Sequence, residues 1–418
     1  MDLLSTARGA RSRATSRVAA GLLRTGSWVR ARLRAAATPR VPLDLSGRDA
    51  APVAVFFTGG PHVRYQLLQW LPVLDELRTH HEVVIVAREP EDVAGLRTDI
   101  PVLVAPTLGD LHAVYEQLGV KVVLYPNNAL GNFQSLVYRD ALHVHVNHGE
   151  SDKVSMVSNQ AKAYDRVVVA GQAAVDRHAR ALLEFDVARL VVCGRPQLDL
   201  PRDPLLAAAR PGVSTVLYAP TWTGEDASNN YTSVDVYGPT IVREALAGGF
   251  RVVYKPHPRV TTTQDPAVEA GHRAVLAAIE ESRRDDPGRD SRVLLDGDVL
   301  GTFDGVDVLV ADVSSVGLDF LYLRPDAPIL LTDRRDDAAA LRLAAPVSQV
   351  AHVVDATTVA DVGTLLEQAL EHDPHARERA AVRAYYFGSE RGESLVRFRE
   401  FVERCMDDRD VAVAGRDG

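Results

Sequence analysis

Four segments of the sequence place histidine, lysine, serine or threonine directly after a run of β-branched residues. They are Asn147 to Lys153, Ala219 to Trp222, Lys255 to Arg259 and Asp312 to Gly317. In open parallel sheets the ligand lies beyond the carboxyl ends of the strands, so these segments are the first candidates for a site. Their side chains suit proton transfer and the binding of anions.

His148 follows the predicted strand 143–146 and precedes Gly149. The glycine allows a sharp turn and a close approach of substrate, and the near-neutral pKa of histidine suits it to accept a proton from an attacking hydroxyl. Lys153 is a candidate for neutralising a phosphate. A turn histidine and a surface lysine are the alternatives, because a His-Gly pair is common by itself.

His257 lies between two prolines in the segment Lys255-Pro256-His257-Pro258-Arg259. The prolines fix the backbone around the imidazole, which a solvated loop does not require. With the cations of Lys255 and Arg259 beside it, His257 is predicted to hold a phosphate oxyanion. A rigid turn that closes the strand is the alternative.

Two further segments offer hydroxyl groups. Ser314 and Ser315 follow Asp312 at a predicted helix start, where hydroxyls and unpaired N–H groups favour an anion; ordinary helix capping explains them equally well. Thr221 is a candidate phosphate ligand, and Trp222 either shapes the cleft or is a buried structural residue.

Other motifs are weak or missing from the sequence. Neither GxGxxG nor GxxxxGK[ST] occurs, which argues against dinucleotide binding and P-loop chemistry. Asp296-Gly297-Asp298 reads first as a turn and only secondarily as a pair of metal ligands.

Short β-branched runs alternate with helical stretches from residue 52 onward, which predicts parallel sheets covered by helices on both faces. A proline-rich passage from Pro196 to Pro211 divides the pattern, so we predict domains at 50–200 and 212–405. The charged stretch 280–292 is predicted to be a solvated loop, and the end after Asp407 is predicted to be disordered. The predicted strands are 53–57, 82–87, 102–105, 120–125, 143–146, 166–170 and 190–193 in the first half and 215–218, 251–254, 292–295, 306–311 and 329–332 in the second.

Composition limits the class of protein. The 418 residues include 46% hydrophobic and 25% charged residues, as in globular proteins, and no apolar run is long enough to span a bilayer. The two cysteines, Cys193 and Cys405, provide neither a disulfide framework nor a zinc cluster. With no cleavable signal peptide visible, a cytoplasmic protein is expected.

Basic charge is confined to the first segment. Residues 1–43 contain nine arginines against the single acid Asp2, a net charge of +8 that leaves −17 for the rest of a chain whose total is −9. Apolar residues at helical spacing predict an amphipathic segment over 1–45 that lies on an anionic membrane surface. A disordered tail and nucleic-acid binding are alternatives, although the acidic body argues against a nucleic-acid partner.

Taken in order, the segments resemble the CDP-glycerol glycerophosphotransferase family, which makes teichoic acid and related polyol-phosphate polymers. The resemblance covers about residues 140–400. His148-Gly149 with Lys153 resembles the family's HG-xxx-K element, and Gly194 to Asp199 its G-x-P-R-x-D turn. The other similar elements are YAPTW at 218–222, [KR]-x-HP at 255–258 and D-x-SS at 312–315.

The resemblance implies an α/β, GT-B-like fold with two Rossmann-like domains facing a central cleft. It further implies transfer of glycerol phosphate or a related polyol phosphate from a CDP-activated donor to a membrane-associated, lipid-linked or polymeric acceptor, on the inner face of the membrane. His148 and His257 would be catalytic. The expected substrate-binding residues are Gly149, Lys153, Thr221, Trp222, Lys255, Arg259, Asp312, Ser314 and Ser315. No metal and no cofactor besides the donor is expected.

Three positions depart from the family pattern. Asn147 replaces an aromatic residue, Glu150-Ser151 replaces Thr-Pro, and Gln197 replaces the arginine of G-x-P-R. These departures leave the acceptor and the polyol open. A GT-B glycosyltransferase or epimerase that uses a UDP-sugar, and a catalytically silent membrane-peripheral nucleotide-binding protein, are the competing interpretations.

Overall fold

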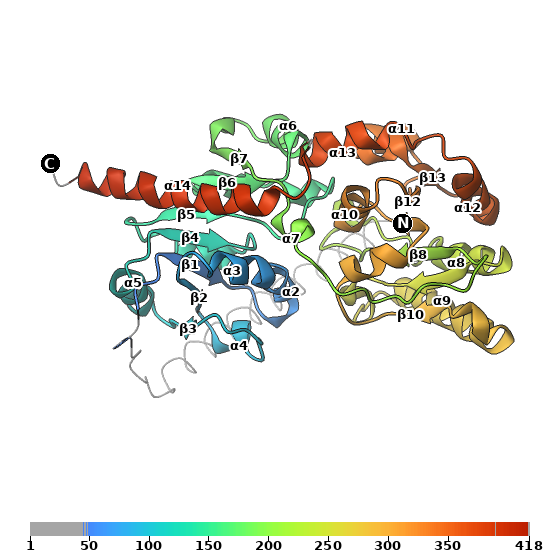
Figure 1. Ribbon diagram of the computed structural model, residues 1–418, viewed down its shortest axis with the longest axis horizontal. Helices are drawn as coiled ribbons and strands as arrows, with labels where there is room; N and C mark the ends of the chain where they lie inside the picture. Colours follow the sequence, from blue (N-terminus) through green and yellow to red (C-terminus); the bar gives the residue numbers. More distant parts are fainter. Residues whose placement is uncertain (1–44, 46, 48, 389, 417–418) are drawn as a thin grey trace, which may run out of the picture. The chain divides into compact units, whose positions relative to one another are not determined.

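The computed structural model describes residues 45, 47, 49–388 and 390–416 (Figure 1). The chain divides into two compact units, Met1–Gly47 and Arg48–Gly418, and the second contains both sheets. The predicted amphipathic segment over 1–45 lies outside the described residues except for Leu45. Among the helices that the structure describes, none combines the length and apolar character needed to cross a bilayer.

The first sheet has seven parallel strands in the order β3-β2-β1-β4-β5-β6-β7. Every residue of β1 is buried, because helices cover both faces of the sheet, and this burial explains the continuous apolar run in the sequence. The strands are β1 (Val53–Phe57), β2 (Val83–Ala87), β3 (Val102–Val104), β4 (Val122–Tyr125), β5 (Leu142–His145), β6 (Arg166–Val169) and β7 (Leu190–Val192).

The second sheet has six parallel strands in the order β10-β9-β8-β11-β12-β13. All of the predicted strands are present in shifted or equal bounds, and β13 is an additional strand that the sequence did not predict. The strands are β8 (Thr215–Ala219), β9 (Arg251–Tyr254), β10 (Arg292–Val293), β11 (Val308–Ala311), β12 (Ile329–Thr332) and β13 (His352–Val354).

Helices follow most strands and pack on both sheets. In the first half they are α2 (Tyr65–Leu68), α3 (Leu71–Leu77), α4 (Pro90–Val93), α5 (Leu108–Gln117), α6 (Gln172–Ala181) and α7 (Pro196–Asp199). The remaining helices are α8 (Gly238–Ala247), α9 (Pro266–Asp285), α10 (Ser315–Leu323), α11 (Ala338–Ala344), α12 (Val362–Glu371), α13 (Arg379–Phe387) and α14 (Ser394–Ala414).

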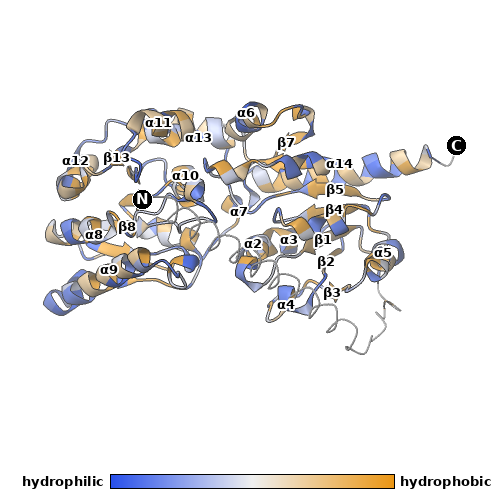
Figure 2. Cartoon of the chain, turned by 180° about the vertical axis from the view of Figure 1, so that it is seen from behind, coloured by the Kyte–Doolittle hydropathy of each residue, from blue (hydrophilic) through white to orange (hydrophobic). Residues whose placement is uncertain are grey.

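The predicted loop at 280–292 is wrong in its first part, because α9 continues to Asp285. Asp265 caps the start of this helix by accepting from the N–H groups of Ala267 and Val268. Near its end, Arg283 pairs with Glu280 at 3.6 Å. The charges of this stretch therefore cover the solvated side of a helix (Figure 2).

The C-terminal helix returns to the first half of the chain. Phe398, Phe401 and Val402 of α14 belong to the same buried cluster as Val53 and Leu124 of the first sheet. Figure 1 shows α14 running along that sheet. The start of α14 therefore contributes to the first core, although the predicted second domain, 212–405, includes it.

The prediction of disorder after Asp407 is wrong for residues up to Ala414, which are helical. Polar contacts to the first half hold this exposed end. Arg409 Nε donates to the carbonyl oxygen of Asp140 at 2.8 Å, and Lys121 Nζ donates to Asp410.

Candidate active site

The turn after β5 presents His148 at the carboxyl end of the first sheet. Asn147 adopts a left-handed conformation with φ of 53°, which asparagine tolerates better than an aromatic residue does. Its side-chain oxygen accepts from the His148 N–H at 2.8 Å, and its carbonyl oxygen accepts from Trp70 Nε1. The departure at residue 147 thus has a structural explanation: it fixes the turn that carries the histidine.

Burial sets the protonation state of His148. Burial is the largest of the causes that lower the pKa of this imidazole to about 3, followed by the nearby Arg195, His145 and Lys153. The Nδ1 atom of His148 is buried and has no hydrogen-bond partner among the described residues. A neutral imidazole with an available lone pair is the form that a general base requires.

His257 lies after β9 and is also held neutral. Burial lowers its pKa to about 3, helped chiefly by Lys153 and Arg259. Its Nδ1 accepts from the backbone N–H of Arg259 at 3.1 Å. A neutral imidazole that accepts at Nδ1 carries its proton on Nε2, so His257 can donate a hydrogen bond to an anion.

Tyr65 of α2 brings the two histidines into one site. Its ring makes edge-on contacts with His148 at 5.6 Å and with His257 at 5.7 Å between ring centroids. The tyrosine thus touches the imidazole after a strand of the first sheet and the imidazole after a strand of the second. Sequence reasoning missed Tyr65, and no local pattern around it indicated the contact.

Lys153 joins the two halves through a hydrogen bond. Its Nζ donates to Thr221 Oγ1 at 2.7 Å. Burial lowers the pKa of Lys153 to about 8, and the carboxylate of Asp312 opposes the shift. The ammonium group of Lys153 therefore links the turn of His148 to the segment after β8, and its lowered pKa brings its loss of charge closer to neutral pH.

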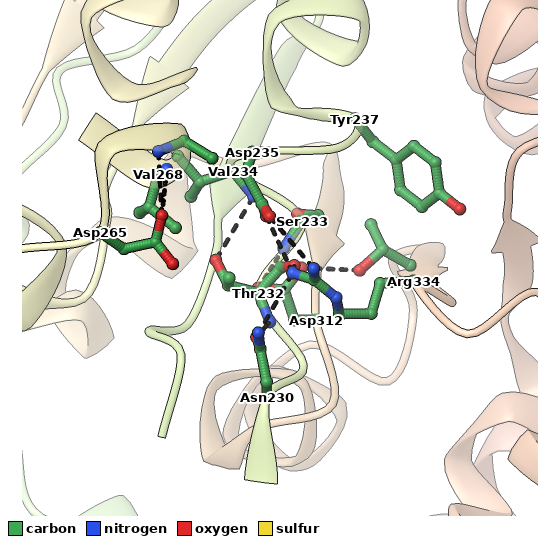
Figure 3. A network of polar contacts seen from close by, with 12 residues as sticks. Asn230, Thr232, Ser233, Val234, Asp235, Tyr237, Asp265, Val268, Asp312 and Arg334 are labelled. Atoms are coloured by element: carbon green, nitrogen blue, oxygen red, sulfur yellow. Dashed lines mark hydrogen bonds and ion pairs between the residues drawn. The ribbon is translucent and has the colours of Figure 1, made fainter. Parts of the chain in front are cut away.

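Asp312 organises the second half of the site (Figure 3). Its carboxylate accepts from the N–H of Thr221 at 2.7 Å, from the N–H of Ser233 at 3.3 Å and from Thr332 Oγ1 at 2.6 Å. Burial raises its pKa to about 6. Both oxygens are occupied by protein groups, so this residue acts as a positioning group for the Thr221 segment.

A second set of contacts holds residues 232–235, the segment whose Ser233 N–H donates to Asp312. Arg334 donates to the carbonyl oxygen of Thr232 at 2.7 Å and pairs with Asp235 at 2.8 Å, as Figure 3 shows. These contacts hold the segment that leads from the site into α8. They involve none of the predicted site residues.

Ser314 and Ser315 lie at the start of α10, as predicted. Ser314 is the extended residue before the helix, and its Oγ is buried without a hydrogen-bond partner in the described part of the chain. Ser315 faces the histidine turn, because a Cβ atom added to Gly149 would lie 3.4 Å from Ser315 Cβ. The glycine after His148 therefore allows a close approach of the two halves.

Trp222 and Arg259 form a pair beside His257. The Arg259 guanidinium lies 3.9 Å from the centroid of the Trp222 ring and pairs with Glu225 at 2.8 Å. The Trp222 ring is 6.0 Å from that of His257. Arg259 thus already has an acidic partner, and its expected contact with phosphate remains a prediction.

Lys255 is buried next to an acidic turn. Burial lowers its pKa, and the carboxylates of Asp298 and Asp296 oppose the shift. These two acids therefore face a lysine. Among the residues that the structure describes, no group of three or more His, Cys, Asp or Glu side chains is arranged to hold a metal ion.

Glu150, the second departure from the family pattern, takes part in a buried ion-pair network. Arg177 of α6 donates to Glu150 at 2.6 Å and to Asp152 at 2.7 Å. Asp152 also accepts from the hydroxyl of Tyr386 on α13. The network anchors the turn that carries His148, so Glu150 has a positioning role.

Comparison with known proteins bears on this site. Residues 146–336 match the model of the family described as CDP-Glycerol:Poly(glycerophosphate) glycerophosphotransferase. The resemblance to this family is confirmed. The matched range contains all of the predicted site residues, from His148 to Ser315. The comparison with curated proteins found no match.

Solved structures share the fold at low sequence identity. A putative UDP-N-acetylglucosamine 2-epimerase from Listeria monocytogenes is 14% identical with a TM-score of 0.53, over 85% of this chain and 96% of that chain. A variant of the wall teichoic acid polymerase TagF, soaked with CDPG, is 12% identical with a TM-score of 0.50, over 88% and 92%. A glycosyltransferase from Rickettsia africae ESF-5 is 12% identical with a TM-score of 0.50, over 86% and 99%. These similarities confirm the predicted GT-B-like fold.

Proposed function

We propose that this protein transfers glycerol phosphate, or a related polyol phosphate, from a CDP-activated donor to an acceptor hydroxyl and releases CMP. The observation that carries the proposal is that His148 and His257, both neutral and both within the segment that matches the family model, meet at the ring of Tyr65. We further propose that the acceptor is held at the membrane, as in teichoic-acid-like polymer synthesis.

In the proposed reaction the acceptor oxygen attacks the β-phosphorus of the donor. A new oxygen–phosphorus bond forms, the bond from that phosphorus to the CMP oxygen breaks, and the hydroxyl proton passes to His148. The neutral state of His148 makes it competent to take that proton. The proton then leaves to solvent, so no covalent enzyme intermediate is needed.

Charge on the diphosphate would be stabilised by groups from the second half. His257 would donate from Nε2, while Lys153 and the hydroxyl of Thr221 lie together at 2.7 Å as a cation and a donor. Ser314 and Ser315 would add hydroxyl and N–H donors at the start of α10. Lys255 and Arg259 would supply positive charge nearby.

The test is nucleotide release from a donor panel. CDP-glycerol, CDP-ribitol and several UDP-sugars are incubated with the protein and a bacterial membrane extract, with His148→Ala as the control. CMP release from one CDP-polyol, lost in the control, is the expected result. UDP release would contradict the proposal and indicate a sugar-transferring or epimerising enzyme, and nucleotide binding without any release would indicate a silent binder.

A further inference from the structure

Arg195 is a buried cation that the proposed reaction has not yet used. It lies between β7 and α7, and only 6% of its surface is exposed. Its Nε and Nη1 atoms have no hydrogen-bond partner within the described residues. Its ion pair is with Asp319 of α10, at 3.3 Å between Nη1 and Oδ1. Buried N–H groups of a guanidinium are costly to leave without acceptors, so this arrangement suits a ligand that supplies them.

The guanidinium points at the turn that carries His148. A Cβ atom added to Gly149 would lie 3.2 Å from Arg195 Nη1 and 3.4 Å from Ser315 Cβ. Arg195 and Ser315, in the first turn of α10, therefore both lie close to Gly149, and a side chain at residue 149 would come between them. The same region contains the buried Oγ of Ser314, for which the described residues likewise offer no hydrogen-bond partner.

The pocket beside this turn belongs to the same region. His148, Gly149, Arg195 and Gln197 all line it. Gln197 occupies the position at which the family turn has an arginine. Arg195 therefore provides the guanidinium in the segment Gly194 to Asp199, two positions earlier.

We propose that Arg195, together with the first turn of α10, binds a phosphoryl oxygen next to His148. The planar guanidinium would donate N–H groups to that oxyanion from Nη1, the atom nearest to the histidine turn, and Asp319, 3.3 Å from Nη1, would hold the guanidinium in place. This inference rests on the proposed function in naming the ligand as a phosphoryl group of the reaction. The group belongs either to the donor or to a phosphate of the acceptor, and the experiment separates the two.

The first measurement uses inorganic pyrophosphate, so that it does not depend on the identity of the nucleotide. Calorimetric binding to the full chain is compared among wild type, Arg195→Gln, Arg195→Lys and Asp319→Asn. We expect Arg195→Gln to weaken binding at least about tenfold, because a charge-assisted contact is lost. Arg195→Lys should retain part of the affinity, and Asp319→Asn, which keeps the guanidinium but loosens its support, should weaken binding less than Arg195→Gln does.

A purely structural role for Arg195 predicts a different pattern. If its only function were to neutralise Asp319, then Asp319→Asn would disturb binding as much as Arg195→Gln does, and the double variant would restore it. The double variant also replaces the ion pair with two neutral amides, so it tests binding without leaving an unpaired buried charge. Unchanged pyrophosphate binding in Arg195→Gln, or wild-type binding in the double variant, would overturn the proposal.

Two further measurements on Arg195→Gln identify the source of the phosphoryl group. Weaker binding of CDP-glycerol without acceptor assigns the contact to the donor, whereas unchanged donor binding with a higher acceptor KM assigns it to the acceptor. If neither changes, the proposal is wrong. If pyrophosphate binding depends on Arg195 but no CMP is released from any donor, the anion site stands and the proposed function fails.

Discussion

At the scale of single residues, burial and neighbouring cations set the chemistry of the site. His148 and His257 share Lys153 as a nearby positive charge, and burial is the largest cause of the low pKa of both. Both imidazoles are therefore neutral at physiological pH. They differ at Nδ1, because that atom of His257 accepts a backbone N–H, whereas that of His148 has no partner among the described residues; the different roles proposed for them rest on this difference.

Replacing His148 by alanine should remove turnover while leaving the donor bound. We expect the rate of CMP release to fall at least about a hundredfold, the scale of general-base catalysis. The dissociation constant for CDP-glycerol, measured by calorimetry, should stay nearly unchanged. His80→Ala is the matched control, because His80 is exposed and pairs with Arg399. Substantial turnover in His148→Ala would remove this residue from the mechanism.

Lys153 should produce an alkaline limb in the pH profile. Its pKa of about 8 means that the lysine is charged below that pH and loses its charge as the pH rises through it. We therefore expect kcat/KM of the wild type to decline above about pH 8. Arginine stays charged in this range, so Lys153→Arg should flatten the profile up to about pH 10.

The control for this assignment is Lys255→Arg, which changes the other buried lysine of the site. It should keep the alkaline limb of the wild type. An alkaline limb that disappears in Lys255→Arg and persists in Lys153→Arg would assign the titration to Lys255.

Site residues could be predicted from the sequence only where a side chain suited to proton transfer or anion binding comes directly after a predicted strand. His148, His257, Thr221 and Ser315 were selected for that reason, and the structure places each of them after a parallel strand. Tyr65 lay outside this logic, because its contacts join residues far apart in the chain. Whether the selected residues act as proposed remains a prediction.

Arg195 was missed for a related reason. Its sequence neighbourhood reads as a turn, and the burial and unmet N–H groups that single it out arise only when α10 packs against it. Tertiary packing, and no local pattern, creates such positions.

At the scale of elements, a buried network anchors the histidine turn to α6. Arg177 pairs with Glu150 and Asp152, whose side chains are only 6% and 3% exposed. Arg177→Met leaves these carboxylates without their cation, so we expect the free energy of unfolding to fall by about 3–5 kcal/mol. Denaturation by urea measures the change.

Arg273→Met is the comparison for that substitution. Arg273 pairs with Glu269 on the surface of α9, where the side chains are 67% and 53% exposed. The loss there should be at most about 0.5 kcal/mol. Equal effects of the two substitutions would show that the Arg177 network does not anchor the turn.

Gly171 permits the close approach of α6 and α13. A Cβ atom at this position would lie 2.3 Å from the carbonyl oxygen of Tyr386. Gly171→Ala must therefore separate the two helices, and we expect a loss of about 1–3 kcal/mol in thermal or chemical unfolding.

The control glycine is Gly109 in α5, where the nearest atom to an added Cβ is 3.7 Å away. Gly109→Ala should be neutral or stabilising by up to about 1 kcal/mol. If Gly171→Ala is as stable as the wild type, α13 can move away from α6 without any loss in the free energy of unfolding.

The elements themselves were largely visible in the sequence, because strands buried on both faces require uninterrupted apolar runs. The errors occur where that rule weakens. β13 has only three residues, two of them partly exposed, and the ends of α9 and α14 are charged and solvated. The end of α14 contacts Asp140 and Lys121 of the first half, and local sequence does not reveal such partners.

At the scale of the whole molecule, charge separates the first segment from the rest. Residues 1–43 carry +8 against −17 for the remainder. We expect deletion of residues 1–40 to reduce cosedimentation with vesicles that contain anionic lipid, and the difference to shrink at high salt. CMP release from a soluble acceptor should be kept. Sedimentation that is the same with and without the segment would refute a membrane role for it.

The return of α14 to the first sheet has a consequence for the order of events on the ribosome. The first sheet ends at Val192, yet its core includes Phe398, Phe401 and Met406. When every strand of the first sheet has been synthesised, the side chains of α14 that complete its core have not yet been made. Domains usually fold in the order in which they are synthesised. Here the earlier half must wait for α14, so its final packing is expected only after the whole second sheet has been synthesised.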